Sequence, residues 1–127
     1  MTENEVAKQI VDAAYKIHTT LGPGLLESAY SAFLAHELKK RGLYVEAEVR
    51  VPVLYDGVEV CDAFRADLIV EDLVIVELKS VEAIAPLHKK QLLTYLRLTG
   101  KKLGLVINFG SAVIKSGIQR VVNGLED

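Results

Sequence analysis

Three charged side chains interrupt two apolar runs that are typical of neighbouring β-strands: Asp67 in the first run, and Glu77 and Lys79 in the second. Burying a carboxylate or an ammonium without a partner costs several kcal/mol, so these positions need a reason. Because a strand has a period of two, Glu77 and Lys79 share one face, roughly 6 to 7 Å apart. A carboxylate and an amine so placed can hold a divalent cation beside a nucleophilic water. The pattern indicates a metal site to which Asp67 adds a second carboxylate.

The ligand types select the kind of metal. Hard cations such as Mg²⁺ take oxygen ligands and keep several waters, so two carboxylates with open positions suit them. Zinc prefers His and Cys, and the three His and one Cys of the chain form no cluster at zinc-ligand spacing. The expected cofactor is therefore Mg²⁺ or Mn²⁺.

The connection between the two runs, Glu71-Asp72, leaves their register open. A plain two-residue turn places Asp67 on the face opposite Glu77, and the two carboxylates then cannot share an ion. A three-residue loop, or a bulge that shifts the register by one, pairs Asp67 with Glu77 and restores the site.

A structural alternative also fits the spacing. Glu77 and Lys79 can form an ordinary ion pair at a strand end, while Asp67 pairs with Arg65 or Lys79. Such a network would hold the hairpin together without any chemistry.

Whole-chain properties bound the answer. The 127 residues suit one domain, residues 1–127, and half of them are apolar, which is an ordinary globular composition. The net charge of −2 gives no global basic field, so a nucleic-acid partner would need a local patch. The N-terminus is acidic and no apolar run reaches the roughly 18 residues of a membrane span. We expect a cytoplasmic protein with no membrane partner.

Hydrophobic periodicity predicts an α/β chain. Helices are expected over residues 3–20, 25–40 and 86–98. Strands are expected over residues 44–55, 58–70, 73–79 and 102–109, and a short terminal strand can follow within 113–122. Asp56-Gly57 is a hairpin-turn signal, and the strands on either side of the third helix should be parallel.

Other candidate residues lie on the helices. Glu27 and Tyr30 stand three apart in the second helix, and Gln91 and Tyr95 stand four apart in the third. Structural roles are open for all four, since Glu27 can complement the helix dipole, both tyrosines can pack, and Gln91 can be solvated. Cys61 is expected to be a small core residue.

The order helix, three strands, helix, strand, with these acids and Glu-x-Lys on the third strand, resembles the PD-(D/E)xK nuclease superfamily. More narrowly, Gly24–Tyr30 matches the pattern that names the bacterial GxxExxY protein family. Further blocks similar to that family follow in the same order: Phe64–Asp67, Val76–Lys79, Gln91–Tyr95 and Ile107–Gly110. The similarity spans nearly the whole chain.

The resemblance implies a restriction-endonuclease-like core (αβββαβ), with a mixed central sheet flanked by helices, and a metal-dependent nuclease activity on DNA or RNA. By the superfamily pattern, Asp67 and Glu77 would bind the metal, with the Leu78 carbonyl as a third ligand. Lys79 would orient or activate the water.

The same pattern assigns a catalytic role to Glu27 as the acid of the first core helix, and to Gln91 and Tyr95 as a Q-x-x-x-Y element. The chain departs from the superfamily name at Ala66, which stands where the name has proline. Two alternatives keep the fold without the activity: a noncatalytic nucleic-acid- or protein-binding module, and a subunit that depends on a partner protein. A homodimer is a further expectation.

Basic clusters are the candidate phosphate contacts, and they can equally be solvated helix ends. They lie at residues 39–41, 89–90 and 101–102.

Overall fold

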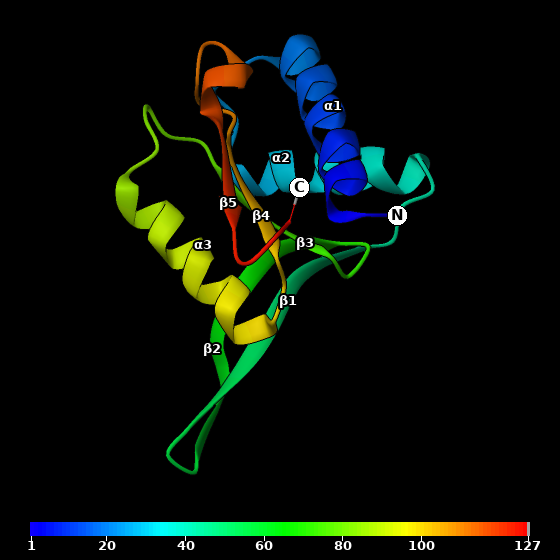
Figure 1. The fold of residues 1–127 in the computed structure, drawn as a ribbon. Coiled ribbons are helices and arrows are strands. Elements are labelled where there is room, and N and C mark those ends of the chain that lie inside the picture. Colours follow the sequence, from blue (N-terminus) through cyan, green and yellow to red (C-terminus); the bar gives the residue numbers. More distant parts are fainter. Residues whose placement is uncertain (127) are drawn as a thin grey trace.

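The computed structural model describes residues 1–126 and contains a five-stranded mixed sheet with helices on both faces (Figure 1). The strands lie side by side in chain order; β3 and β4 are parallel, and every other neighbouring pair is antiparallel. The elements are α1 (Glu3–Leu21), α2 (Glu27–Lys40), β1 (Val45–Tyr55), β2 (Val58–Val70), β3 (Val74–Lys79), α3 (Pro86–Thr99), β4 (Leu103–Asn108), the 3₁₀ helix η1 (Ile114–Gly117) and β5 (Ile118–Val122).

This architecture confirms the α/β prediction and the parallel pair around the third helix. The last apolar segment divides into η1 and β5, and α2 begins two residues later than expected. None of the helices within residues 1–126 combines the length and apolarity that crossing a bilayer requires.

The two faces of the sheet are covered by different helices. α1 and α2 pack on one face with Val74, Val76 and Leu78 of β3, whereas α3 packs on the other with Ile75 (Figure 1). Because side chains alternate along a strand, the odd-numbered positions of β3 belong to the α3 face. This parity assigns Glu77 to the face that α3 covers.

The hairpin between β2 and β3 has a three-residue loop. Val70 pairs with Val74 and Leu68 pairs with Val76, so one further step of the same register sets Asp67 opposite Glu77. The two-residue turn is therefore wrong, and the alternative that brings the carboxylates together is confirmed.

The loop contains two residues in the left-handed conformation, Glu71 and Asp72, both with φ of +54°. A left-handed conformation costs a non-glycine residue roughly 1 to 2 kcal/mol. Glu71 exchanges two hydrogen bonds with the backbone of Tyr44: its N–H donates to the carbonyl, and its carboxylate accepts from the N–H, both at 2.8 Å. Lys101 Nζ lies 2.8 Å from the Asp72 carboxylate. These contacts offset the strain and fix the register.

The β1–β2 hairpin projects beyond the helices as a long arm (Figure 1). Its turn is Asp56-Gly57, as predicted, with positive φ at both residues. Cys61 lies on this arm and is exposed, so its expected place in the core is wrong. No helix within residues 1–126 reaches the tip of this arm, where both faces meet solvent.

Asn108, at the end of β4, fixes the chain that leaves β3. It is fully buried, and its Oδ1 accepts from the N–H groups of Val81 and Gly110, each at 3.0 Å. Its Nδ2 donates to the Val81 carbonyl at 2.9 Å and to Ser111 Oγ at 3.3 Å. A Cβ on Gly110 would stand 2.3 Å from the Val81 carbonyl oxygen, so only glycine fits. Because Asn108 is the β4 partner of Lys79, this clamp sets the end of the strand that carries Glu77 and Lys79.

We predict that Asn108→Leu lowers the free energy of unfolding by about 2 to 4 kcal/mol, because a buried group of similar size would leave several polar partners unsatisfied. Urea unfolding measures the change. Asn123→Ala is the control, since Asn123 is half-buried and its side chain donates one hydrogen bond, to the Lys101 carbonyl. Equal losses in the two variants would contradict the clamp.

Candidate functional site

The candidate site forms where β2 and β3 carry acids on neighbouring strands. The Leu78 N–H donates to Asp67 Oδ2 at 2.8 Å, so the Asp67 carboxylate turns toward β3 beside Glu77. The two carboxyl groups therefore belong to one cluster.

Glu77 is the electrostatically unusual member of this cluster. Its pKa is raised from the ordinary 4.5 to about 8, first because the carboxyl is buried, and then because it lies beside the Asp67 charge and hydrogen-bonds to that side chain; the Asp67 backbone and Lys79 oppose the shift. Within residues 1–126, Oε1 of Glu77 is a buried oxygen without a hydrogen-bond partner. Near neutral pH this group needs either a proton or a cation.

Tyr95 of α3 lies near this cluster. Its ring stacks on Phe64 of β2, with centroids 4.0 Å apart and planes 2° from parallel. Burial raises the pKa of the Tyr95 phenol, and the charges of Glu77 and Asp67 raise it further. The tyrosine thus lies within electrostatic reach of both carboxylates and keeps its proton.

Asp67 also borders a cavity on the side of α2. The β1–β2 ladder pairs the residues before and after Glu48 and Asp67 but skips these two, and Glu48 has φ of +52°. Beside this interruption lies a cavity of about 180 Å³. It is lined by Glu27, Ser28, Ser31, Glu48, Arg65 and Asp67. The first residue of α2, Glu27, therefore shares a cavity with Asp67.

Tyr30 sets the loop that delivers Glu27. Its ring is fully buried and stacks on Phe109 of the β4 end, with centroids 4.3 Å apart. Its hydroxyl donates to the Gly22 carbonyl at 2.5 Å and accepts from the Leu25 N–H at 3.2 Å. Tyr30 is thus a structural residue, and it fixes the backbone that enters α2.

Lys79 follows Glu77 by two residues and is half-buried. Across the described part of the chain, no ion pair within 4.0 Å links Lys79 or Arg65 to Asp67, or Lys79 to Glu77. The alternative of a local ion-pair network is therefore not supported.

Gln91 and Leu78 complete the predicted set. Gln91 is exposed on α3 and makes no hydrogen bond to the carboxylates among residues 1–126. Leu78 buries its side chain against α1 and α2, while its backbone continues directly from Glu77. The structure thus groups Asp67, Glu77 and Tyr95 on one side and Asp67 with Glu27 on the other, and leaves Gln91 outside.

A family model described as the PD-(D/E)XK nuclease superfamily matches residues 4–121 of the chain. The chain belongs to the PD-(D/E)XK nuclease superfamily. No curated protein and no solved structure matches it. The match confirms the superfamily resemblance, and with it the restriction-endonuclease-like core: a mixed sheet flanked by helices.

The residues of this superfamily member suit a divalent cation. No group of three or more His, Cys, Asp or Glu side chains in residues 1–126 is arranged to hold a metal ion. Mg²⁺ needs fewer protein ligands than that, since it is usually bound through one or two carboxylates and keeps several waters. The unpartnered oxygen of Glu77 beside the Asp67 carboxylate is a place where a cation would replace a costly proton or an unsatisfied charge.

Sequence reasoning missed Glu48 as a residue of the site, and it did not anticipate the positions of Arg65 and Phe64 there. Glu48 lines the cavity where the β1–β2 ladder is interrupted, and no local sequence pattern predicts that interruption; Arg65 lines the same cavity. Phe64 of β2 stacks on Tyr95 of α3. The signal available in the sequence was an aromatic residue three positions before Asp67.

We predict that Glu77 makes stability depend on pH without metal. The folded state holds the Glu77 proton more tightly than the unfolded chain, so stability falls as pH rises from 4.5 to about 8. Between pH 5 and 8.5 the wild type should lose about 2 to 4 kcal/mol relative to Glu77→Gln, less than the full linkage value because the site can relax. Urea unfolding in EDTA measures this difference.

The control is Glu82→Gln, which alters an exposed carboxylate. Its stability should depend on pH as that of the wild type does. If the free energy of unfolding changes equally with pH in the wild type and in Glu77→Gln, Glu77 is not a buried carboxyl that holds a proton.

Proposed function

We propose that the protein is a divalent-metal-dependent nuclease that hydrolyses phosphodiester bonds in DNA or RNA, and that it belongs to the GxxExxY branch of its superfamily. The observation that carries this proposal is the buried Glu77 carboxyl, which has an unpartnered oxygen and lies beside Asp67. Perturbed carboxyl groups of this kind concentrate at functional sites.

In this proposal Asp67, Glu77 and the Leu78 carbonyl hold Mg²⁺ or Mn²⁺. A bound divalent ion stabilises charge on the phosphoryl oxygens and lowers the pKa of a bound water. The protein supplies two fixed carboxylates, and the Leu78 N–H keeps the Asp67 side chain oriented toward β3. A preorganised first ligand loses little entropy when the ion arrives.

Lys79 is the proposed catalytic cation. It emerges two residues after Glu77, and the strand period places both side chains on one face. It has no ion-pair partner within residues 1–126, so its ammonium is available to orient a water or a phosphoryl oxygen.

The remaining proposed roles differ in their support. Glu27 borders the same cavity as Asp67 and can position a water or a second cation there. Tyr95 keeps its proton and can donate a hydrogen bond to a substrate oxygen. Gln91 is exposed one helical turn before Tyr95 and is assigned to substrate contact rather than to the metal.

Support for the GxxExxY branch comes from what its motif does here. Gly24 has φ of +112°, a conformation that favours glycine, and Glu27 begins α2 beside the Asp67 cavity. Tyr30 locks the loop between them through its hydroxyl. Each named position of the motif thus has a physical role in presenting Glu27.

We predict that purified protein cleaves DNA or RNA with Mg²⁺ or Mn²⁺, and that Lys79→Ala lowers the rate by about 10²- to 10⁴-fold, as for loss of a group that assists proton transfer. Gel assays on labelled single-stranded and duplex substrates measure the rate. Lys8→Ala, which changes an exposed lysine of α1, is the matched control and should retain the wild-type rate. Folded wild-type protein that cleaves none of these substrates would favour the noncatalytic module.

We also predict that Mg²⁺ or Mn²⁺ raises the melting temperature, by about 5 °C or more at a hundredfold excess over Kd, because the ion binds the folded state alone. Differential scanning fluorimetry measures the shift. It should disappear in an Asp67→Asn variant that retains the fold. A melt unmoved by millimolar metal would count against the ligand set.

A further inference from the structure

The charges of the chain are strongly segregated. Residues 83–125 contain seven Lys and Arg and no Asp or Glu. The rest of the chain holds the other eight basic residues and all seventeen acidic ones. The net charge of −2 therefore hides a basic segment that comprises α3, β4, η1 and β5.

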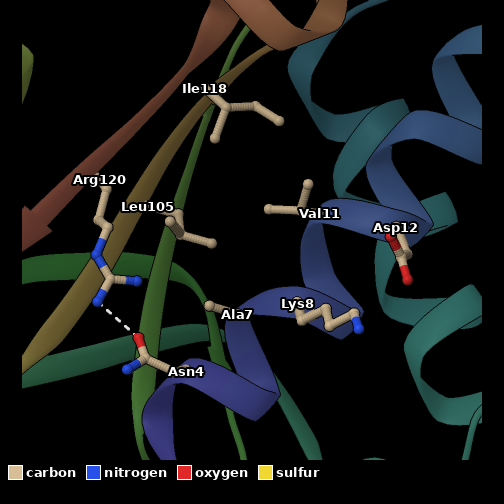
Figure 2. A pocket seen from close by; sticks show the side chains of 8 residues that line it. All are labelled: Asn4, Ala7, Lys8, Val11, Asp12, Leu105, Ile118 and Arg120. Atoms are coloured by element: carbon tan, nitrogen blue, oxygen red, sulfur yellow. Dashed lines mark hydrogen bonds between the residues drawn. The ribbon is translucent and has the colours of Figure 1, made fainter. Parts of the chain in front are cut away.

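Two of these seven cations have structural partners. Lys101 pairs with Asp72 of the β2–β3 loop at 2.8 Å. Arg120 of β5 turns toward α1, where its Nη2 donates to Asn4 Oδ1 at 2.6 Å at the rim of a cavity between α1 and β5 (Figure 2). Both contacts tie elements of the fold together.

Lys89, Lys90 and Arg97 of α3 differ from this pair. All three are exposed, and none has an ion-pair partner anywhere in residues 1–126. Lys90, Leu93 and Arg97 follow one side of the helix at steps of three and four residues. Lys89, Lys90 and Leu93 line a groove of about 270 Å³ against β5, whose other walls are Arg120, Val121 and Val122.

We propose that this α3–β5 surface, made of Lys89, Lys90, Arg97 and the groove beside them, binds the phosphate backbone of a nucleic acid. The proposal rests on the proposed function and says where its substrate lies outside the cleavage site. Like charges held together on a helix without counterions repel one another, and a chain of phosphates relieves that repulsion while releasing its own condensed ions.

The spacing suits a nucleic-acid strand. Lys90 and Arg97 are seven residues apart, about 10 Å along the helix, which equals roughly three steps of 3.4 Å along the axis of a duplex. The apolar floor of the groove, Leu93 and Val121, would contact sugars without desolvating charge.

The position relative to the site is also suitable. Tyr95, on the same helix, lies within electrostatic reach of Asp67 and Glu77, and the helical period sets Lys90 and Arg97 on a different side of α3. A helix is about 10 to 12 Å in diameter, so a strand cut at the cluster would reach the surface within a few nucleotides.

The test is binding without cleavage. Fluorescence anisotropy in EDTA follows a fluorescein-labelled 30-nucleotide single strand and a 30-base-pair duplex over a salt series. The full chain is compared with Lys89→Glu/Lys90→Glu. We expect the double variant to bind at least tenfold more weakly, with a log Kd against log salt slope that is shallower by about 1.4 to 1.8, the value of two lost phosphate contacts.

The matched control is Lys39→Glu/Lys40→Glu, the exposed basic pair at the end of α2. It carries the same charge change and should shift the affinity less than twofold. Lys89→Gln/Lys90→Gln repeats the test without new acids, and circular dichroism confirms that each variant folds. Equal weakening by the two reversal pairs, or no weakening by the α3 pair, would overturn the proposal.

Two further outcomes separate this surface from the cleavage site. Nucleic acid bound through Lys89 and Lys90 but never cleaved supports the surface and contradicts the nuclease. Cleavage by a protein whose two α3 variants bind as the wild type does would support the nuclease and contradict the surface. Absence of binding to either nucleic acid, or tighter binding to phosphatidylserine vesicles than to both, would reject the nucleic-acid assignment of the surface.

Discussion

Two carboxyl groups held side by side, one of them buried, are the constraint on which this structure depends. Asp67 and Glu77 come from neighbouring strands, and burial together with the Asp67 charge raises the energy of the charged form of Glu77. A fold selected only for stability would have an aliphatic residue at position 77. Ile75, two positions earlier on the same face of β3, is such a residue. The proposed function accounts for this cost, because a cation bound there would offset the repulsion and give the unsatisfied oxygen a partner.

Much of the surrounding structure holds that pair in place. The β2–β3 loop sets the register through two residues in the left-handed conformation. Contacts with Tyr44 and Lys101 offset the conformational strain of these residues. At the other end of β3, Asn108 ties down the chain that follows Lys79. Tyr30 couples the entry of α2 to the end of β4 through its stack on Phe109. Stability and site geometry are therefore linked, and changes far from the carboxylates can loosen them.

The sequence predicted the elements well, because their apolar periods were long and their turn residues explicit. It left the register of Asp67 open, since the left-handed pair Glu71-Asp72 depends on contacts from distant segments. It misplaced Cys61, because no local sequence pattern shows that the β1–β2 hairpin extends beyond the helices that cover the sheet. It also missed Glu48, which an interruption of strand pairing exposes to the cavity.

The most direct test of the shared site is anomalous scattering from crystals grown or soaked with Mn²⁺. The account predicts one strong manganese peak within bonding distance of both the Asp67 and Glu77 carboxylates, with the Leu78 carbonyl beside it. The same crystals of Glu77→Gln should lose or greatly weaken that peak. Manganese bound only elsewhere, or Asp67 and Glu77 side chains on opposite faces of the sheet, would contradict it.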